Sequence, residues 1–487
     1  MRGVGGQLRS RHPVAAGRVA RHRPCVCSSC RGPVRRCWHA AEARTVVRGK
    51  APGAANGPYG RAVGARQGET QVLPVPDSDH LHLLRAPGAA PILFDSVSLE
   101  AFLLEPSDLG PDGEWPCVRL RGERDVVIAA RRRGFARKPG HINTFRVVLT
   151  ESCNFACRYC FETTSARRPR SMSKRTLERT VQVILDANAG QGVAVHWFGG
   201  EPLLLWSHID WAMASFAEAA RRGQISSVHH SMTTNGSLVT PRIARDLARA
   251  RCDVFVSVDG PRAVNDRSRV DRSGGGTFDE ALRGFRLLAQ AGVDVGLLVT
   301  ADASSVSTLF ESVRELIETV GVRKVGVNTP QPSRNGWSVD GAVLAEQMHQ
   351  LVRYCNDQDV RLLGPGLRVL RALKYANPHV DDCRSPSGAM AATITPEGQL
   401  SGCIVSWQDG RPWKLRDLSS RSLLELEHIK VTPTVQPGCH GCIAEMVCGG
   451  PCALEMVLAG VHPDRCAFYR TFVVLSVLES TRDGVRL

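Results

Sequence analysis

Long apolar runs are missing from this sequence. No stretch approaches the roughly eighteen consecutive apolar residues of a membrane-spanning helix, so we expect no membrane anchor. The first residues also lack the apolar core of a secretory signal, and we therefore expect a cytoplasmic protein. Acidic side chains are scarce in the first 75 positions, which hold fourteen Lys or Arg and only two acids. This tail carries twelve of the fifteen net positive charges, so the nearly neutral remainder predicts no nucleic-acid partner.

Composition divides the chain into four regions. Residues 1–75 are rich in Arg, Ala, Gly and Pro without an apolar period, which predicts a disordered basic tail. Residues 76–140 contain short strand-like pieces such as Ala90–Phe94, and we expect a small β-rich lead-in there. The pattern predicts an α/β domain over 141–360 and a cysteine-rich domain ending in a helix over 361–487.

The third region alternates short β-branched runs with stretches of helical length, which predicts βα units and a parallel sheet. Polar, glycine-rich motifs recur directly after the strands. Barrel enzymes place their chemistry on that rim, so we expect a partial (β/α)6 barrel of the TIM type rather than a doubly wound sheet. The expected strands are Phe145–Thr150, Val193–Phe198, Val228–Thr234, Val254–Val258, Val293–Thr300 and Lys324–Val327. The expected helices are Ser173–Asn188, Ile209–Arg221, Pro241–Arg249, Phe278–Ala291, Ser304–Val320 and Gly341–Asn356.

Cysteine is unusually frequent, at seventeen residues. Because disulfides are rare in reducing compartments, this number indicates metal-binding or catalytic thiols. Four cysteines of the basic tail are interpreted as incidental, with a small zinc site as the alternative: Cys25, Cys27, Cys30 and Cys37. Three others fit no spaced set and are expected to be small buried hydrophobes: Cys117, Cys252 and Cys355.

One cysteine set follows the first expected barrel strand. Cys153, Cys157 and Cys160 form a C-x3-C-x2-C pattern with Tyr159 before the last cysteine. Three thiolates at this spacing can bind one face of a cubane iron–sulfur cluster and leave the fourth iron open to a small ligand. A structural zinc site would need a fourth ligand close by. The spacing therefore favours a reactive cluster.

This segment resembles the signature loop of the radical S-adenosylmethionine superfamily. The resemblance implies that the open iron of a 4Fe-4S cluster binds the amine and carboxylate of S-adenosylmethionine. It also implies reductive cleavage to a 5′-deoxyadenosyl radical, which abstracts a hydrogen atom from the substrate. Tyr159 matches the position that lies near the adenine.

Motifs after the later strands extend the resemblance. The family's GGEP motif, which contacts the methionyl amine, is matched by Gly199, Gly200, Glu201 and Pro202. Glycines let a backbone approach a ligand closely, and Glu201 can accept a hydrogen bond from an ammonium group. The rim loop after the third strand, which contains Asn235, also resembles the peptide-modifying branch.

Two further motifs are expected to contact the rest of S-adenosylmethionine. Ser257 and Asp259 lie where ribose contacts are expected, and simple turn chemistry is the alternative. Arg269 matches a residue that binds the methionyl carboxylate through a bidentate fork. Asn265 stands where the family usually has His, which leaves the geometry beside Arg269 open.

A second set consists of seven later cysteines: Cys383, Cys403, Cys439, Cys442, Cys448, Cys452 and Cys466. Their order and spacing resemble the seven-cysteine pattern of the SPASM domain. A turn at Thr395–Gly398 is expected to form a hairpin that brings its first two members together. The resemblance implies a nearer auxiliary cluster, one ligand short, on Cys383, Cys403 and Cys452. It implies a fully ligated outer cluster on Cys439, Cys442, Cys448 and Cys466. A zinc ribbon is the alternative.

The resemblance covers about residues 143–470 and implies a peptide or protein maturase with one reactive and two auxiliary 4Fe-4S clusters. We expect an oxidoreductase that crosslinks or oxidises a residue of a ribosomally made precursor peptide. Its electrons would come from an external one-electron donor such as a flavodoxin or ferredoxin. The alternatives are an anaerobic sulfatase-type maturase forming formylglycine, a maturase of a redox-cofactor precursor, and a non-catalytic iron–sulfur or zinc protein. No spacing selects the catalytic proton acceptor.

Overall fold

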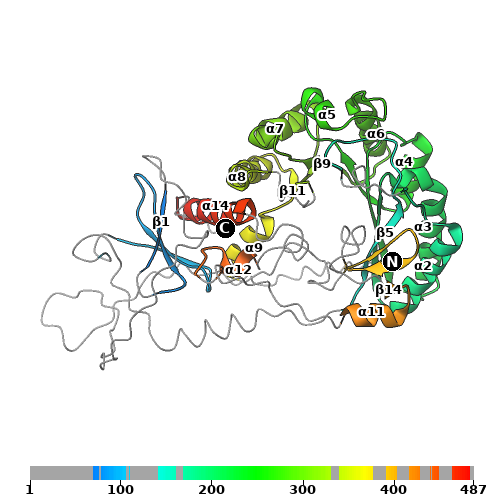
Figure 1. The fold of residues 1–487 in the computed structure, drawn as a ribbon, viewed down its shortest axis with the longest axis horizontal. Coiled ribbons are helices and arrows are strands. Elements are labelled where there is room, and N and C mark those ends of the chain that lie inside the picture. Colours follow the sequence, from blue (N-terminus) through cyan, green and yellow to red (C-terminus); the bar gives the residue numbers. More distant parts are fainter. Residues whose placement is uncertain are drawn as a thin grey trace, which may run out of the picture.

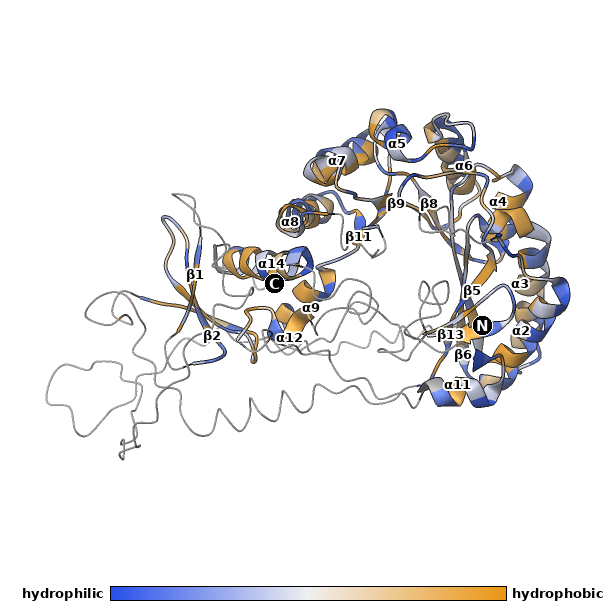
Figure 2. Cartoon of the chain, viewed as in Figure 1, coloured by the Kyte–Doolittle hydropathy of each residue, from blue (hydrophilic) through white to orange (hydrophobic). Residues whose placement is uncertain are grey.

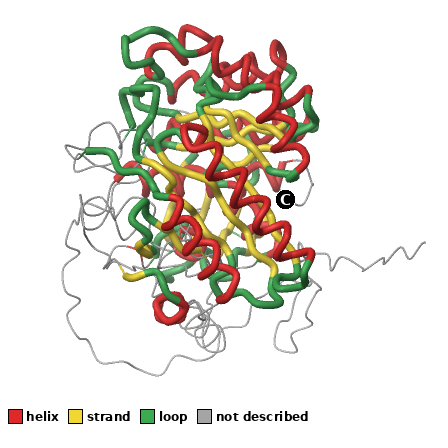
Figure 3. Tube along the Cα trace, turned by 90° about the vertical axis from the view of Figure 1, so that its right-hand side faces the viewer, coloured by secondary structure: helices red, strands yellow, loops and turns green. Residues whose placement is uncertain are grey.

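A curved sheet covered by helices on its convex side forms the main body (Figure 1). Figure 3, turned by 90°, shows helices in front of the strands. The computed structural model describes residues 70–75, 78–105, 109, 141–160, 168–330, 339–376, 391–402, 416–427, 439, 441–448 and 463–482. In this part of the chain, no helix has the length and apolar character to cross a membrane.

Ten strands form the main sheet, in the order β11-β10-β9-β8-β7-β6-β5-β12-β13-β14. The strands from β5 to β11 pair in parallel with their neighbours in chain order. The predicted partial barrel is therefore confirmed, with two parallel strands more than the sequence indicated, β11 and β12 (Ala391–Ile394). The bounds are β5 Thr144–Thr150, β6 Gly192–Gly199, β7 Ser227–Thr234, β8 Asp253–Ser257, β9 Val295–Thr300, β10 Lys324–Asn328 and β11 Arg361–Leu363.

Helices connect these strands and cover the convex side. Several begin where a side chain satisfies a free backbone N–H: Ser173 accepts from Thr176, and Thr240 accepts from Ile243. Two helices of the following set, α5 and α9, were not expected. The bounds are α2 Lys174–Ala187, η2 Pro202–Leu205, α3 Trp206–Arg221, α4 Pro241–Arg249, α5 Arg262–Ser268, α6 Phe278–Gln290, η3 Val306–Thr308, α7 Leu309–Val320, α8 Gly341–Asp357 and α9 Leu367–Tyr375.

The hydrophobic core lies between the sheet and its helices. Side chains alternate along a strand, so Val195 and Trp197 of β6 are buried in this core. His196 and Phe198 point to the opposite, concave side and are half-buried. Figure 2 shows the hydrophilic residues of α3 turned away from the sheet. The concave side is therefore the face on which a ligand can be recognised.

A separate antiparallel sheet precedes the barrel. It consists of β1 Gln71–Pro74, β2 Leu81–Arg85, β3 Ile92–Asp95 and β4 Glu100–Leu103 in sequential order. One face holds a small core that includes Leu81, Leu83 and Leu93. The other face joins the main core through residues such as Phe94. The expected strand at Ala90–Phe94 overlaps β3, while the boundaries of the four predicted regions stay predictions.

The C-terminal elements extend the sheet and then return to the barrel. Strand β12 (Ala391–Ile394) pairs in parallel with β5, and the predicted turn at Thr395–Gly398 leads to β13 (Gln399–Ser401). Gly398 has a φ of +75°, which favours glycine. Helix α14 packs against α8. The other bounds are β14 Arg416–Asp417, α11 Ser420–Glu427, α12 Glu445–Cys448 and α14 Pro463–Arg482.

Candidate active site

The loop with the three cysteines leaves the carboxyl end of β5 and is fastened to the segment after α5. The backbone N–H of Ala156 donates to the carbonyl of Val270 at 2.8 Å, and that of Arg158 donates to the carbonyl of Ser268 at 2.9 Å. Arg269 lies between these two anchor points. These backbone hydrogen bonds align the loop against Arg269.

The thiols of Cys153, Cys157 and Cys160 lie close enough to influence one another electrostatically. Burial raises the pKa of Cys153 to about 11 and also raises the pKa of Cys157, which Arg269 opposes. Sulfur ligands must be deprotonated to bind a metal, so a cationic iron centre would supply the charge that favours their thiolates. Three partly accessible sulfur donors on one loop fit an iron–sulfur cluster.

The spacing of these thiols differs from that of a single-ion site. Among the residues described, no group of three or more His, Cys, Asp or Glu side chains is arranged to hold one metal ion. The irons of a cubane occupy separate corners, so its ligands lie farther apart than those of a zinc ion. Among the described residues, Cys439, Cys442, Cys448 and Cys466 are likewise not arranged around a single metal ion.

The two glycines of the GGEP motif lie against the cysteine loop. A Cβ atom on Gly199 would lie 2.3 Å from the carbonyl oxygen of Thr150, and one on Gly200 would lie 2.3 Å from that of Ser152. Gly199 also has a φ of +148°. We expected these glycines to allow the close approach of a ligand. The structure shows that they allow the close approach of the backbone at the start of the cysteine loop. Their contact with S-adenosylmethionine stays a prediction.

Glu201 is fully buried at the point where β6 and β7 end. Its carboxylate accepts hydrogen bonds from the N–H of Leu203 (3.0 Å), the hydroxyl of Thr234 (2.7 Å) and the N–H of Asn235 (2.7 Å). Burial raises its pKa to about 7, although the three donors act in the opposite direction. Glu201 thus joins two strand ends, and Pro202 begins the short helix η2 that it caps.

Asn235 holds the loop from the side of β7. Its side-chain amide donates to the amide oxygen of Asn154 at 2.8 Å and lies 3.8 Å from Sγ of Cys153. Asn154 donates in turn to Ser237 at 2.8 Å. Asn235 was predicted from the sequence as a site residue, and Asn154 was not, although it directly follows the first cysteine. Arg272 was not predicted either, and it donates to the carbonyl of Cys153 at 2.6 and 2.9 Å.

A buried polar cluster lies beside the thiols. Asp259 accepts a hydrogen bond from Tyr159 at 2.6 Å and from the N–H of Thr300 at 2.9 Å, and it pairs with Arg269 at 3.0 Å. Burial raises the pKa of Tyr159 well above its ordinary value, so the phenol stays neutral and donates. Asp259 thus has protein partners where we expected a ribose contact; Ser257 ends β8 two residues earlier.

Arg269 keeps one donor unused. Its Nε is buried and has no hydrogen-bond partner among the described residues. A ligand carboxylate at this position would satisfy it, which fits the expected contact to S-adenosylmethionine. Asn265, the departure from the family pattern, accepts from the N–H of Asp259 at 3.2 Å, and its carbonyl accepts from the N–H of Arg269 at 2.8 Å. It therefore holds both members of the pair in place.

The outer cysteine set is partly described. Cys439, Cys442, Cys448 and Cys466 are half-buried, and Arg470 forms a hydrogen bond to Cys442. Cys439, Cys442 and Cys466 lie close enough to affect one another electrostatically. The SPASM assignment stays a prediction. Further cysteines lie outside the described residues: Cys25, Cys27, Cys30, Cys37, Cys117, Cys383, Cys403 and Cys452. Cys252 and Cys355 are buried in the core, as expected.

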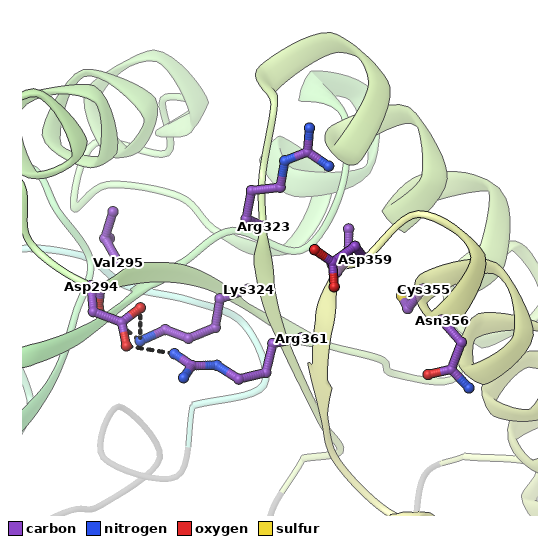
Figure 4. A pocket seen from close by; sticks show the side chains of 9 residues that line it. Asp294, Val295, Arg323, Lys324, Cys355, Asn356, Asp359 and Arg361 are labelled. Atoms are coloured by element: carbon purple, nitrogen blue, oxygen red, sulfur yellow. Dashed lines mark hydrogen bonds and ion pairs between the residues drawn. The ribbon is translucent and has the colours of Figure 1, made fainter. Parts of the chain in front are cut away.

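A cavity of about 500 Å³ lies at the opposite end of the barrel, where β9, β10 and β11 begin (Figure 4). Lys324 donates to the carbonyl of Asp294 at 2.7 Å and pairs with its carboxylate at 3.1 Å; Arg361 pairs with the same carboxylate at 2.5 Å. These bonds lower the pKa of Asp294, although burial opposes them. The amino-terminal face of a barrel serves stability, so we assign this network to the fold.

Comparisons with known proteins agree with this geometry. Residues 147–303 match the Radical SAM superfamily. A serine-type anaerobic sulfatase-maturating enzyme of Klebsiella aerogenes is 23% identical over 72% of this chain and 88% of its own length. The mycofactocin maturase MftC of Mycolicibacterium smegmatis is 29% identical over 54% of this chain, which spans 64% of that relative.

Solved structures show the same fold. The structure of anSMEcpe with bound AdoMet has a TM-score of 0.60 at 17% identity, covering 70% of this chain and 95% of that one. SuiB of Streptococcus suis bound to S-adenosylmethionine has a TM-score of 0.50 at 15% identity, covering 82% and 99%. The residues matched by the superfamily model, 147–303, include the three-cysteine loop and the Arg269–Asp259 pair. Residues 147–303 therefore match a radical S-adenosylmethionine domain, and the proteins that this chain resembles include peptide- and protein-modifying maturases.

Proposed function

We propose that this chain is a radical S-adenosylmethionine maturase that modifies one residue of a ribosomally made precursor peptide by crosslinking or oxidation. The observation that carries the proposal is the placement of three cysteine thiols on one loop beside the buried Arg269. A bound 4Fe-4S cluster with S-adenosylmethionine supplies reductive cleavage and abstraction of a hydrogen atom. The chain supplies the binding, the orientation and the exclusion of water.

The residues around the thiols have separate tasks in this proposal. Cys153, Cys157 and Cys160 hold the cluster. Arg269 orients a carboxylate with its free Nε–H, and Asp259 fixes the guanidinium in place. We further propose that Tyr159, Gly199, Gly200, Glu201, Pro202, Asn235 and Ser257 line or support the same ligand.

Two proposed substrate classes differ in their support. A precursor peptide is supported by the likeness to SuiB, whose structure has been solved with its precursor peptide SuiA bound. The TM-score between that structure and this chain is 0.50. The second candidate is a sulfatase-type maturase forming formylglycine. It is supported by the match to 88% of the Klebsiella aerogenes enzyme. The auxiliary clusters and the one-electron donor belong to the proposal in both cases.

The first test measures 5′-deoxyadenosine. The full chain is reconstituted anaerobically with iron and sulfide, then incubated with S-adenosylmethionine and dithionite. We expect the wild type to form 5′-deoxyadenosine and the C153A/C157A/C160A variant to form none. The matched control is C252A/C355A, which removes two thiols from the core and should leave formation intact. If the triple variant and the wild type formed equal amounts of 5′-deoxyadenosine, the proposed enzymatic activity would be refuted.

The second test separates the two substrate classes by mass spectrometry. The active enzyme is incubated with a cysteine-containing sulfatase peptide and, separately, with candidate precursor peptides. Conversion of cysteine to formylglycine replaces the sulfur by oxygen and also removes two hydrogen atoms, whereas a crosslink removes two hydrogen atoms and keeps all heavy atoms. A change confined to the sulfatase peptide would favour the second candidate.

A further inference from the structure

A polar row crosses the concave face of the sheet below the three-cysteine loop. The register pairs Thr393 of β12 with Arg146 of β5, Arg146 with His196 of β6, and His196 with Ser231 of β7. Paired residues of adjacent strands point to the same side of a sheet, and the strands lie about 4.8 Å apart. Their neighbours Val147 and Ile394 belong to the helix-covered core, so the row faces the concave side.

Arg146 is a cation without a countercharge among the described residues. Its half-buried side chain has no hydrogen bond or ion pair with any residue that the structure describes. A carboxylate at the same level, Asp253, lies three strands away and already faces His229 at 3.4 Å. A partly buried guanidinium without a partner is unfavourable in the free protein, so this position is suited to an anion from outside.

Two neighbours of Arg146 also offer unused hydrogen-bonding capacity. The hydroxyl of Thr393 is fully buried and has no partner within the described residues. His196 shares a hydrogen bond of 2.9 Å with Ser231, and its Nε2 lies 3.5 Å from the hydroxyl of Thr233. Burial and, to a lesser degree, Arg146 lower the pKa of His196 to about 4, so its ring is neutral. A neutral imidazole can donate one N–H without adding charge.

We propose that Arg146, His196 and Thr393 form a subsite for a carboxylate of the peptide substrate, an inference that rests on the proposed function. The three side chains come from adjacent strands at one level and can all donate hydrogen bonds. None of them carries a negative charge, so the complementary group is a negatively charged hydrogen-bond acceptor. A carboxylate matches the fork of a guanidinium in two parallel bonds. Placed below the loop, it would position the peptide inside the barrel.

The carboxylate has two sources in a peptide, and three probes distinguish them. The probes are acetyl-Ala-Glu-Ala-amide, acetyl-Ala-Gln-Ala with a free carboxyl terminus, and the neutral acetyl-Ala-Gln-Ala-amide. Binding to the reconstituted full chain with S-adenosylmethionine is measured by isothermal titration calorimetry. We expect one acidic probe to bind about tenfold more tightly than the neutral probe, as a charge-assisted pair implies. The tighter acidic probe identifies the source.

Two variants test the residues. R146Q should abolish the preference for the acidic probe, whereas R262Q, on the exposed Arg262–Asp279 pair, should keep it. T393V removes a buried hydroxyl that has no partner among the described residues, so it should raise the thermal stability of the protein. It should at the same time weaken the binding of the acidic probe. A purely structural role of Thr393 would not produce these opposite effects.

The outcomes separate this inference from the proposed function. R146Q should retain iron content and 5′-deoxyadenosine formation, which shows that the variant is folded. Equal affinity of the wild type for all three probes overturns the subsite while the enzyme activity stands. Loss of S-adenosylmethionine binding in R146Q also overturns it, because the carboxylate would then belong to that molecule. Absence of 5′-deoxyadenosine from the wild type refutes the proposed function instead.

Discussion

The guanidinium of Arg269 lies 3.0 Å from the carboxylate of Asp259, and both side chains are more than nine-tenths buried. Asp259 also accepts hydrogen bonds from the hydroxyl of Tyr159 on the cysteine loop and from the N–H of Thr300 at the end of β9. One buried charge pair therefore connects the loop to two strands. Its energetic role follows from its burial, because a charge left alone there has no water to solvate it.

Replacing Asp259 by Asn should destabilise the fold strongly. The variant leaves Arg269 buried without a countercharge, and breaking such a pair costs about 3–5 kcal/mol of unfolding free energy. Chemical denaturation measures the change. The control D279N removes the partner of the fully exposed Arg262, where solvent screens the interaction, and should have no measurable effect. Similar losses in the two variants would contradict the buried role.

The stability of the protein should depend on Glu201 between pH 4.5 and 7. Burial raises the pKa of this group from 4.5 to about 7, so in this interval the folded state holds a proton that the unfolded state has released. The free energy of unfolding contributed by Glu201 therefore falls as the pH rises through the interval, by roughly 3 kcal/mol in total. Urea denaturation at pH 4.5, 6 and 7.5 measures this slope.

E201Q removes the titrating group and should flatten that dependence. Gln keeps one acceptor oxygen and loses the bond from the N–H of Asn235, which lowers stability at every pH. The informative quantity is therefore the difference between low and high pH, from which this constant loss cancels. An unchanged slope in E201Q would assign the pH dependence to other groups.

Much of the barrel could be predicted because its signals are local. The expected strands and helices of residues 143–356 reflect apolar periodicity and capping side chains such as Ser173 and Thr240, which act within a few residues. The short strand β11 escaped prediction, because three residues carry too little periodicity. The pairing of β12 with β5 escaped it as well, since no local pattern records which distant strand lies next to an edge.

The proposed cluster cysteines could likewise be selected from the sequence, because a metal site imposes spacing on its ligands. The partners of the site were not. Glu201 and Asp259 were expected to face a ligand, yet their hydrogen bonds go to Asn235, Thr234 and Tyr159. These contacts join residues 33 to 100 positions apart, and only the fold brings them together.

Gly200→Ala should impair loading of the reactive cluster. The new Cβ would lie 2.3 Å from the carbonyl oxygen of Ser152, which is backbone and cannot rotate away, so the loop that carries Cys153 must shift. Iron per chain after anaerobic reconstitution should fall. The control G192A places its Cβ 2.9 Å from the hydroxyl of Ser227, a side chain that can change rotamer. Full iron content in G200A would show that the loop tolerates the displacement.

Arg470 should raise the reduction potential of the proposed outer cluster. It follows Cys466 by one turn on α14, so both lie on the same helix face, and its guanidinium forms a hydrogen bond to Cys442. Reduction adds a negative charge to a cluster, and a nearby cation stabilises the more negative state. R470Q should therefore lower the midpoint potential, and R470K, which keeps the charge, should lower it less. The titration is followed by electron paramagnetic resonance in the C153A/C157A/C160A background, where the reactive cluster does not contribute. Equal midpoint potentials in R470Q and the parent protein would show that the charge of Arg470 has no effect on the reduction of the cluster. Arg470 would then only hold the helix in place.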